Sequence, residues 1–196
     1  MKKWIPVLAI LAIVIFWGIT SYNGLISKDE NVASQWGNVE SSYQRRADLI
    51  PNIVNTAKGY AEFEQETLTK VIEARSKATS VTIDPTNITP AQLEQFQEVQ
   101  SGLSSALARL LAVFERYPDL KANENFKELI NELERTENRI NVERNRYNEV
   151  VNPYNTSVRS FPTSLIAGML GFEKKAYFEA EEGTDQAPEV EFDFGS

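Results

Sequence analysis

Residues 126–161 read FKELINELERTENRINVERNRYNEVVNPYNTSVRSF, and this stretch decides the fold. In alternating steps of four and three, nearly all residues on one face are apolar or aromatic: Phe126, Ile130, Leu133, Glu137, Ile140, Arg144, Tyr147, Val151, Tyr154, Val158 and Phe161. This spacing is typical of a long α-helix that packs against other helices as in a coiled coil. One helix cannot bury such a face alone. The sequence therefore predicts an all-α fold, an elongated antiparallel helical bundle.

The amino-acid composition excludes several kinds of chemistry. The 196 residues include neither Cys nor His. The chain therefore has no disulfide, no thiolate nucleophile and no imidazole, which is the commonest general base and zinc ligand. It also contains no P-loop, G-x-G-x-x-G or G-x-S-x-G string. We expect no enzymatic activity and no catalytic, cofactor-binding or metal-binding residue.

The net charge of −8 is concentrated at one end of the chain. Residues 179–196 contain seven of the 28 acidic residues and no Lys or Arg, so the remaining 21 nearly balance the 20 basic residues. Nucleic-acid binding needs a basic surface, which this balance does not provide. We expect no nucleic-acid partner, and we interpret residues 179–196 as an acidic, disordered tail.

Residues 1–27 predict a membrane anchor. Lys2 and Lys3 precede an uncharged window, residues 4–27, which is long enough to cross a lipid bilayer with about 30 Å of hydrocarbon. A cleaved signal peptide is the alternative, although no A-x-A-like site follows the apolar run. Because the lysines precede the span, the positive-inside rule favours a cytoplasmic N-terminus and an extracytoplasmic body.

A second apolar stripe follows the anchor directly and runs from Val32 to Ala61. Its residues recur in steps of three and four, and the helical spacing continues to Ser80. Pro51 lies within the pattern and removes one backbone donor, so we expect a kink where its ring meets the carbonyl of Ala47. We interpret residues 22–80 as one long kinked helix, with a break at Gly59 as the alternative.

Two more long helices are predicted after this one. Residues 89–92 (TPAQ) have the composition of a capping box, and helical spacing continues from there to Tyr117, before Pro118. Asn123 or Asn125 can cap the 126–161 helix. The apolar segment 163–172 is too short to span a membrane. We expect it to pack back onto the bundle, with a membrane surface or a partner as the alternative contact.

Five charged residues are candidates for a polar network. Glu137 and Arg144 occupy otherwise apolar positions of the 126–161 helix, and each is expected to meet an opposite charge or a hydrogen-bonding group on a neighbouring helix. Arg45, Arg46 and Asp48, just before Pro51, supply the nearest candidates. The alternatives are a functional polar pocket for the first two residues and a solvated face for the other three.

The candidate interface residues lie on the part of the first helix nearest the anchor: Val32, Trp36, Val39 and Tyr43. If residues 22–80 form one helix of about 88 Å, at 1.5 Å per residue, the 89–117 helix covers only about half of it. The stripe would then be exposed, and exposed apolar stripes usually mark interfaces. We therefore expect a homo-oligomer. A break at Gly59 would instead allow the segments to cover one another in a monomer.

Several sequence strings occur in order along the chain. They are RRADLIPN (45–52), KGYA (58–61), YPDLKAN (117–123), TENRI (136–140), the Tyr-Asn pairs at 147–148 and 154–155, and the Phe-Pro pair at 161–162. Together they resemble the LemA family of bacterial membrane-anchored helical-bundle proteins, over roughly residues 22–178. The resemblance implies a four-helix bundle behind one N-terminal span in the bacterial inner membrane, and it supplies no catalytic residue.

The resemblance also implies a type of function. One relative is tied to membrane invagination, and family members often occur with membrane proteases. We expect an anchor (1–27), a bundle (28–178) and a tail (179–196). Together they would form a non-enzymatic single-pass membrane protein that scaffolds an assembly or shapes a membrane. The alternative is an adaptor or sensor that presents partners to a membrane protease.

Overall fold

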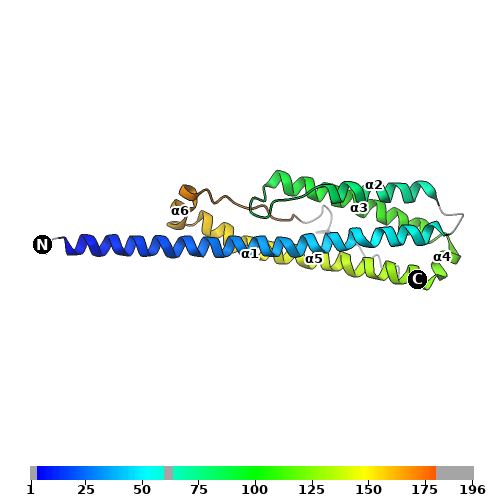
Figure 1. The fold of residues 1–196 in the computed structure, drawn as a ribbon, viewed down its shortest axis with the longest axis horizontal. Helices are drawn as coiled ribbons and strands as arrows, with labels where there is room; N and C mark the ends of the chain where they lie inside the picture. The colour runs from blue at the N-terminus through cyan, green and yellow to red at the C-terminus, as the bar shows by residue number, and fades with distance from the viewer. Residues whose placement is uncertain (1–3, 60–63, 180–196) are drawn as a thin grey trace, which may run out of the picture.

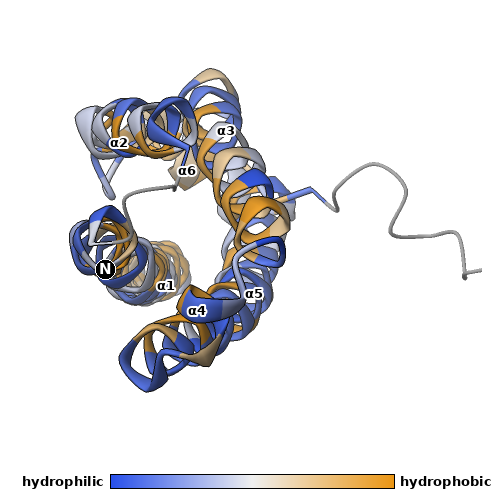
Figure 2. Cartoon of the chain, turned by 90° about the vertical axis from the view of Figure 1, so that its right-hand side faces the viewer, coloured by the Kyte–Doolittle hydropathy of each residue, from blue (hydrophilic) through white to orange (hydrophobic). Residues whose placement is uncertain are grey.

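The computed structural model describes residues 4–59 and 64–179. Within these ranges all regular elements are helices: α1 (Ile5–Lys58), α2 (Gln65–Ser80), α3 (Pro90–Phe114), α4 (Pro118–Ala122), α5 (Glu124–Arg159) and α6 (Thr163–Leu170). The four long helices α1, α2, α3 and α5 form an elongated bundle, with α4 and α6 near its opposite ends (Figure 1). Viewed along the bundle, they surround a common interior (Figure 2). The predicted all-α bundle is confirmed.

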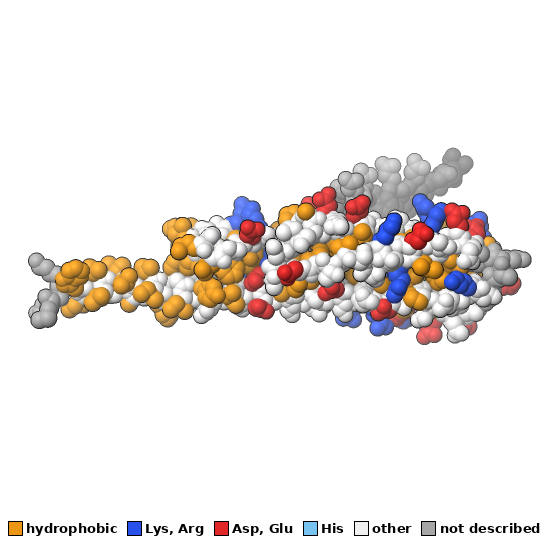
Figure 3. Space-filling view, turned by 45° about the horizontal axis from the view of Figure 1, so that its top comes forward, with side chains coloured by type: hydrophobic (Ala, Val, Ile, Leu, Met, Phe, Trp, Pro, Cys, Tyr) orange, Lys and Arg blue, Asp and Glu red, His pale blue; other side chains and the backbone are white. Residues whose placement is uncertain are grey.

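The first part of α1 projects from the bundle as an apolar rod. Its most apolar 18-residue window has a mean hydropathy of 2.2 and no buried residue. Figure 3 shows the rod without charged side chains, whereas Lys, Arg, Asp and Glu lie over the body. Within the described ranges, α1 alone is long and apolar enough to cross a membrane. Leu25 is its first buried residue, so the bundle begins where the predicted anchor ends.

α1 ends at Lys58, and the chain returns beside it as α2. The prediction of one helix over residues 22–80 is therefore wrong, and the alternative of a break at Gly59 is confirmed. Pro51 lies inside α1 without ending it. The carbonyl of Ala47, which loses its helical donor at Pro51, accepts a hydrogen bond of 2.7 Å from Nε of Arg75 in α2. The neighbouring helix thus supplies the donor that proline lacks.

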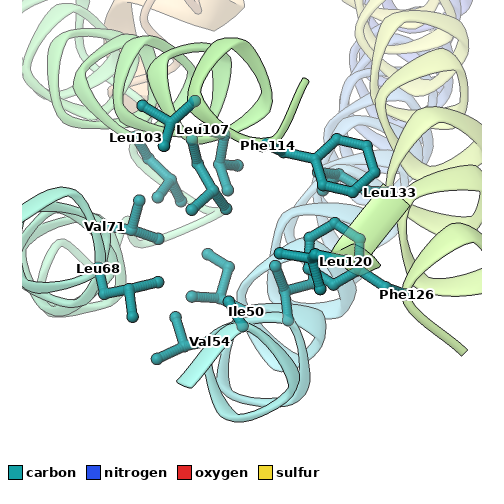
Figure 4. Packing of buried hydrophobic residues seen from close by; sticks show 14 of the residues in the cluster. Ile50, Val54, Leu68, Val71, Leu103, Leu107, Phe114, Leu120, Phe126 and Leu133 are labelled. Carbon is teal, nitrogen blue, oxygen red and sulfur yellow. The ribbon is translucent and has the colours of Figure 1, made fainter. Parts of the chain in front are cut away.

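The half of the bundle far from the anchor has a core to which five helices contribute. Figure 4 shows its side chains pointing toward one another, among them Ile50 and Val54 of α1, Leu68 of α2 and Leu107 of α3. Two predicted caps fix the helices that border this core. Thr89 and Gln92 form the capping box of α3, and the side chain of Asn123 accepts from the backbone N–H of Phe126 at the start of α5.

The half of the bundle nearest the anchor buries the four residues predicted as an interface. Val32, Trp36, Val39 and Tyr43 are 0%, 1%, 0% and 7% exposed, respectively. Four parts of the chain cover them, namely α5, the start of α3, the α2–α3 loop and the segment after α6, through Ile83, Ile88, Leu93, Phe96, Ile140, Tyr147, Val151 and Phe178. The loop and the last segment cover the part of α1 that α2 does not reach. The expected exposure of this stripe, on which the predicted interface depended, is therefore wrong, whereas self-association itself stays a prediction.

α6 packs on the bundle with one side only. Ala167 is buried, whereas Phe161, Leu165 and Met169 are 80%, 58% and 85% exposed. Phe161 was predicted as the last apolar residue of the α5 face, but α5 ends at Arg159 and the phenyl ring points away from the core. Gly171, with φ of 77°, ends α6 in the left-handed conformation that favours glycine.

Residues 172–179 form an extended segment that lies along α5. The hydroxyl groups of Tyr154 and Tyr147 donate to the carbonyls of Glu173 and Ala176, at 2.9 and 3.2 Å. Burial, with the carboxylates of Asp29 and Glu173 adding to it, raises the pKa of Tyr154 to about 12. Burial also raises the pKa of Tyr147 well above its usual value. The two tyrosines therefore bind the extended segment through protonated hydroxyl groups.

Two asparagines of α5 bind the same segment by its backbone. The side-chain amide of Asn155 donates to the carbonyl of Lys175 and accepts from its N–H, both at 2.9 Å. Asn148 makes the same pair of bonds with Phe178, at 2.8 and 2.9 Å. The predicted disordered tail, residues 179–196, lies outside the described residues except for Glu179.

Trp36→Ala is expected to lower the free energy of unfolding by about 3–5 kcal/mol, because it replaces a fully buried indole with a cavity. Tyr177→Ala removes an aromatic side chain that is 41% exposed and should cost much less. Urea unfolding followed by circular dichroism measures both variants. Equal unfolding midpoints would place Trp36 at the surface and contradict its burial within one chain.

Tyr154→Phe is expected to reduce the loss of stability at alkaline pH. In the folded chain Tyr154 stays protonated up to about pH 12, whereas in the unfolded chain it ionises near its ordinary pKa of about 10. Between these values the unfolded state binds fewer protons, so the free energy of unfolding falls as pH rises. Urea titrations between about pH 9 and 12 should give a shallower decline for the variant. Parallel declines would mean that the hydroxyl is solvated.

Candidate functional site

A groove of about 560 Å³ lies between α3 and α5, and α1 forms its floor. The α3 wall carries small polar residues, including Ser101, Ser104 and Ser105, and the α5 wall carries Asn141 and Arg144. Small side chains such as these serines usually allow two helices to pack closely. Here they line an open space instead. The groove therefore has hydrogen-bonding side chains on both walls, next to aliphatic ones such as Leu107 and Leu133.

Arg46 lies at the floor of this groove with only 2% of its side chain exposed. Its Nη1 donates to Oε1 of Glu137 at 2.7 Å and to Oγ of Ser104 at 2.9 Å. Its Nη2 donates to Oε1 of Gln100 at 2.6 Å. Nε2 of Gln100 donates in turn to the carbonyl of Ala78 at 3.1 Å. This set of bonds, the Arg46 network, joins α1, α2, α3 and α5.

The guanidinium group of Arg46 also lies over the ring of Tyr43, 5.1 Å from its centroid. Within the part of the chain that the structure describes, its Nε is buried and has no hydrogen-bond partner. A buried arginine needs compensation at each donor, because desolvation of the cation is costly. The network supplies that compensation at both Nη atoms, whereas the Nε–H donates to no acceptor among the described residues.

The other predicted polar residues lie outside the Arg46 network. Arg45 pairs with Glu132 at 2.6 Å on the surface, where its hydrogen bond lowers the pKa of the Glu132 carboxyl. Asp48 is exposed and accepts a hydrogen bond of 2.8 Å from the amide of Gln44, four residues before it. Arg45 and Asp48 thus belong to a solvated face, which was the alternative interpretation of this cluster.

Arg144 lines the groove but binds the extended segment. Its Nη2 donates to the carbonyl of Glu179 at 2.9 Å, and its guanidinium group lies 5.0 Å from the centroid of the Phe178 ring. Of the five predicted residues, the structure therefore brings Arg46 and Glu137 into direct contact and places Arg144 at the edge of the same groove.

Sequence reasoning missed four residues of this region as polar contacts: Gln100, Ser104, Asn148 and Asn155. Gln100 occupies an otherwise apolar position of α3, which is the same signal that selected Glu137. The asparagines are marked by the repeat of Tyr-Asn at seven residues, but nothing local indicates that their partner is a backbone segment about 20–30 residues later.

The groups in the groove are suited to binding. The cation of Arg46 is neutralised by Glu137, and the groove also carries amides and hydroxyls that donate and accept hydrogen bonds, beside aliphatic side chains such as Leu111 and Ile140. Within residues 4–59 and 64–179, no three Asp or Glu side chains lie close enough together to hold a metal ion.

Glu137→Ala is expected to lower the free energy of unfolding by about 2–4 kcal/mol, because it leaves the buried guanidinium group of Arg46 without its counter-charge. Glu132→Ala removes the partner of the exposed Arg45 and should change the melting temperature little. Thermal unfolding of the two variants, measured side by side, is the test. Equal melting temperatures would mean that Glu137 does not compensate Arg46.

Comparison with known proteins finds relatives that match most of this chain. Protein LemA of Metamycoplasma hominis is 28% identical over 118 residues, which cover 60% of this chain; the chain spans 50% of that relative's length. Magnetosome protein MamQ 2 of Paramagnetospirillum magneticum is 24% identical over a 200-residue alignment, with 91% of this chain and 73% of the relative covered. Magnetosome protein MamQ of Magnetospirillum gryphiswaldense is 24% identical, with 84% and 66% covered.

A sequence model of one protein family matches residues 35–192. That range contains most of the bundle part of α1, all of α2 to α6, the extended segment and the residues that form the Arg46 network. The apolar rod lies before the matched region, and the match continues past Glu179, the last described residue. With its helical bundle, its candidate transmembrane helix and this match, the chain belongs to the LemA family.

Proposed function

We propose that this protein is a single-pass membrane scaffold, which holds partner proteins at a bilayer without catalysing a reaction. One observation carries the proposal: α1 continues without a break from the exposed apolar rod into the buried core of the bundle. Anchor and bundle therefore share one helix, with no flexible linker between them. A scaffold needs this property, because it must present its surfaces at a fixed height and angle.

The dimensions of α1 support a body that stands upright on the membrane. Its 54 residues correspond to about 80 Å at 1.5 Å per residue. In this proposal about 35 Å of this length crosses the bilayer, up to residue 27, and the remainder extends beside α5. The Arg46 network and the bond from Arg75 to Ala47 tie this part of α1 to the other long helices. The body is thus a stiff extension of its own anchor.

α6 offers a second contact with lipid. It lies beside α1 at the end of the bundle from which the rod projects (Figure 1). Phe161, Leu165, Met169 and Leu170 are between 55% and 85% exposed there. Apolar side chains at this height suit the boundary between headgroups and acyl chains. In this arrangement α6 packs on the bundle with one side and rests on the membrane with the other. Packing on the bundle and contact with a membrane, which the sequence left as alternatives for residues 163–172, would then both occur.

The relatives are consistent with a role in a membrane-associated assembly. MamQ proteins are named for the magnetosome, and this chain is similar to them over most of its length. For this protein we propose insertion in the bacterial inner membrane with the body outside the cytoplasm, as the lysines before the span favour. Its partners would be other membrane proteins, including a membrane protease, or further copies of itself.

Photocrosslinking in intact cells tests the scaffold proposal. A photoreactive amino acid is placed singly at Glu73 of α2, Glu94 of α3 or Arg139 of α5, all exposed positions on three different helices. At least one position should give discrete adducts of higher mass, which mass spectrometry identifies. The matched control is the buried Leu103, which should give none.

A variant that lacks residues 1–27 distinguishes a scaffold at the membrane from a soluble binding protein. The same adducts should disappear when the body is released from the bilayer. Absence of adducts from all three exposed positions would contradict the proposal. Adducts that persist without the anchor would contradict its dependence on the membrane.

A further inference from the structure

Three parts of the chain meet at the end of the bundle from which the rod projects, and each changes there between uncharged and charged residues. On α1 the uncharged window 4–27 ends at Lys28. α5 carries its last charge at Arg159, residues 160–172 have none, and charged residues return at Glu173. This second uncharged segment contains the whole of α6. The anchor is therefore accompanied by a shorter uncharged turn at the same end of the body.

Side-chain contacts show that the three changes lie at one level of the body. Nζ of Lys28 donates to Oγ of Ser157, two residues before Arg159. Nζ of Lys175 lies 2.7 Å from Oδ1 of Asp29, the residue that follows Lys28. The first charged residues of α1, the last of α5 and those that begin the extended segment are therefore side by side. We call this level the charge boundary.

α6 lies beyond the charge boundary, beside the uncharged part of α1 (Figure 1). The ring of Phe172 contacts that of Tyr22, with centroids 6.3 Å apart. Tyr22 precedes Lys28 by six residues, which is about 9 Å along a helix. Residues 4–24 are otherwise exposed, and the partly buried ones share one side of α1: Trp17, Gly18 and Ser21. α6 thus covers a part of α1 that, in the proposed function, crosses the bilayer.

The backbone at both ends of α6 has hydrogen-bond partners within the chain. The N–H groups of Ser164 and Leu165 donate to carbonyls of the preceding turn, and those of Gly171 and Phe172 donate to the carbonyl of Ala167. Hydrocarbon supplies no hydrogen bonds, so a turn that enters it needs partners of its own. These bonds make residues 160–172 compatible with contact with acyl chains.

The charge boundary itself has the character of a headgroup level. Arg159 and Lys174 are exposed, and neither has an ion-pair or hydrogen-bond partner among the residues that the structure describes. The acidic residues Glu30 and Glu173 are exposed at the same level. Both signs of charge are solvated among lipid headgroups, whereas charges are costly among acyl chains. The boundary therefore suits headgroups, and the uncharged level beyond it suits hydrocarbon.

We propose that the charge boundary is the headgroup level of the bilayer and that residues 160–172 extend below it as a re-entrant turn. The partner of the exposed side of α6 is then phospholipid of the leaflet nearest the body, whose acyl chains contact Leu165 and Met169. Arg159 and Lys174 bind the phosphate groups of these lipids. This inference rests on the proposed insertion of the anchor and goes beyond it, because the body itself enters the bilayer instead of standing on its surface.

Nitroxide labels test the depth of α6 in the full-length protein, reconstituted in phospholipid vesicles. The chain has no Cys, so each single-cysteine variant carries one label. Collisions of the label with O2, which concentrates in hydrocarbon, are compared with collisions with a water-soluble nickel complex. Met169→Cys, at a position that is 85% exposed, should give a ratio of O2 to nickel collisions far above that of Val142→Cys, at a 46% exposed position of α5. We expect a difference of at least about threefold for a helix immersed at the boundary of headgroups and acyl chains.

Tyr177→Cys is the matched control on the other side of the charge boundary. Tyr177 is also an exposed apolar residue, only three residues after Lys174. Its label should give the same ratio as Val142→Cys. A low ratio at Met169→Cys, or a ratio at Tyr177→Cys as high as at Met169→Cys, would overturn the proposal. Shielding of the Met169→Cys label from both reagents would mean that protein covers α6, which would overturn it as well.

Val14→Cys separates this inference from the proposed function. Val14 lies in the rod and is 54% exposed, so an inserted anchor gives its label a high ratio. A high ratio at Val14→Cys with a low ratio at Met169→Cys would overturn the immersion of α6 alone. Low ratios at both positions would contradict insertion of the anchor, and both proposals would fail.

Discussion

The buried guanidinium group of Arg46 is the constraint on which the relative placement of the four long helices depends. A buried cation is costly unless acceptors and a counter-charge compensate it, and the acceptors of both Nη atoms come from α3 and α5. Gln100 donates a further bond to the carbonyl of Ala78 in α2. Apolar side chains alone can pack in several registers. A charged group with fixed donor directions is compatible with few of these registers. The Arg46 network therefore favours one arrangement of α1, α2, α3 and α5.

A second constraint acts on the half of the bundle nearest the anchor, where α2 does not reach. There α1 is covered by the α2–α3 loop and by the extended segment, whose backbone is bound by Asn148 and Asn155. A chain without regular structure would ordinarily bury unsatisfied backbone groups. The asparagines replace the missing sheet or helix partners, and their spacing of seven residues suits an extended chain that advances three. This match lets an irregular segment form part of a core.

The two constraints meet in α1. This helix contributes Asp29, Trp36 and Arg46 to successive levels of the body, and the same helix forms the apolar rod. The anchor and every level of the bundle are therefore joined by one continuous helix. The exposed apolar side chains of α6 lie at the junction between the two parts. These features explain why a protein built in this way suits the presentation of surfaces at a bilayer.

The sequence by itself determined the helical class, the apolar face of α5, the caps at Thr89 and Asn123 and the apolar window of the anchor. Each of these depends on residues within one or two helical turns of one another. It also marked Glu137 as a residue in need of a partner, because a charge at an apolar position is visible locally. Only the tertiary structure decided that the chain breaks at Gly59, since the apolar periodicity continues through that glycine and a single glycine costs a helix only about 1 kcal/mol. The tertiary structure also decided the burial of Trp36 and the choice of Arg46 rather than Arg45 as the partner of Glu137. Both depend on segments brought together from distant parts of the chain, and local spacing carries no record of which distant segment will cover a given face.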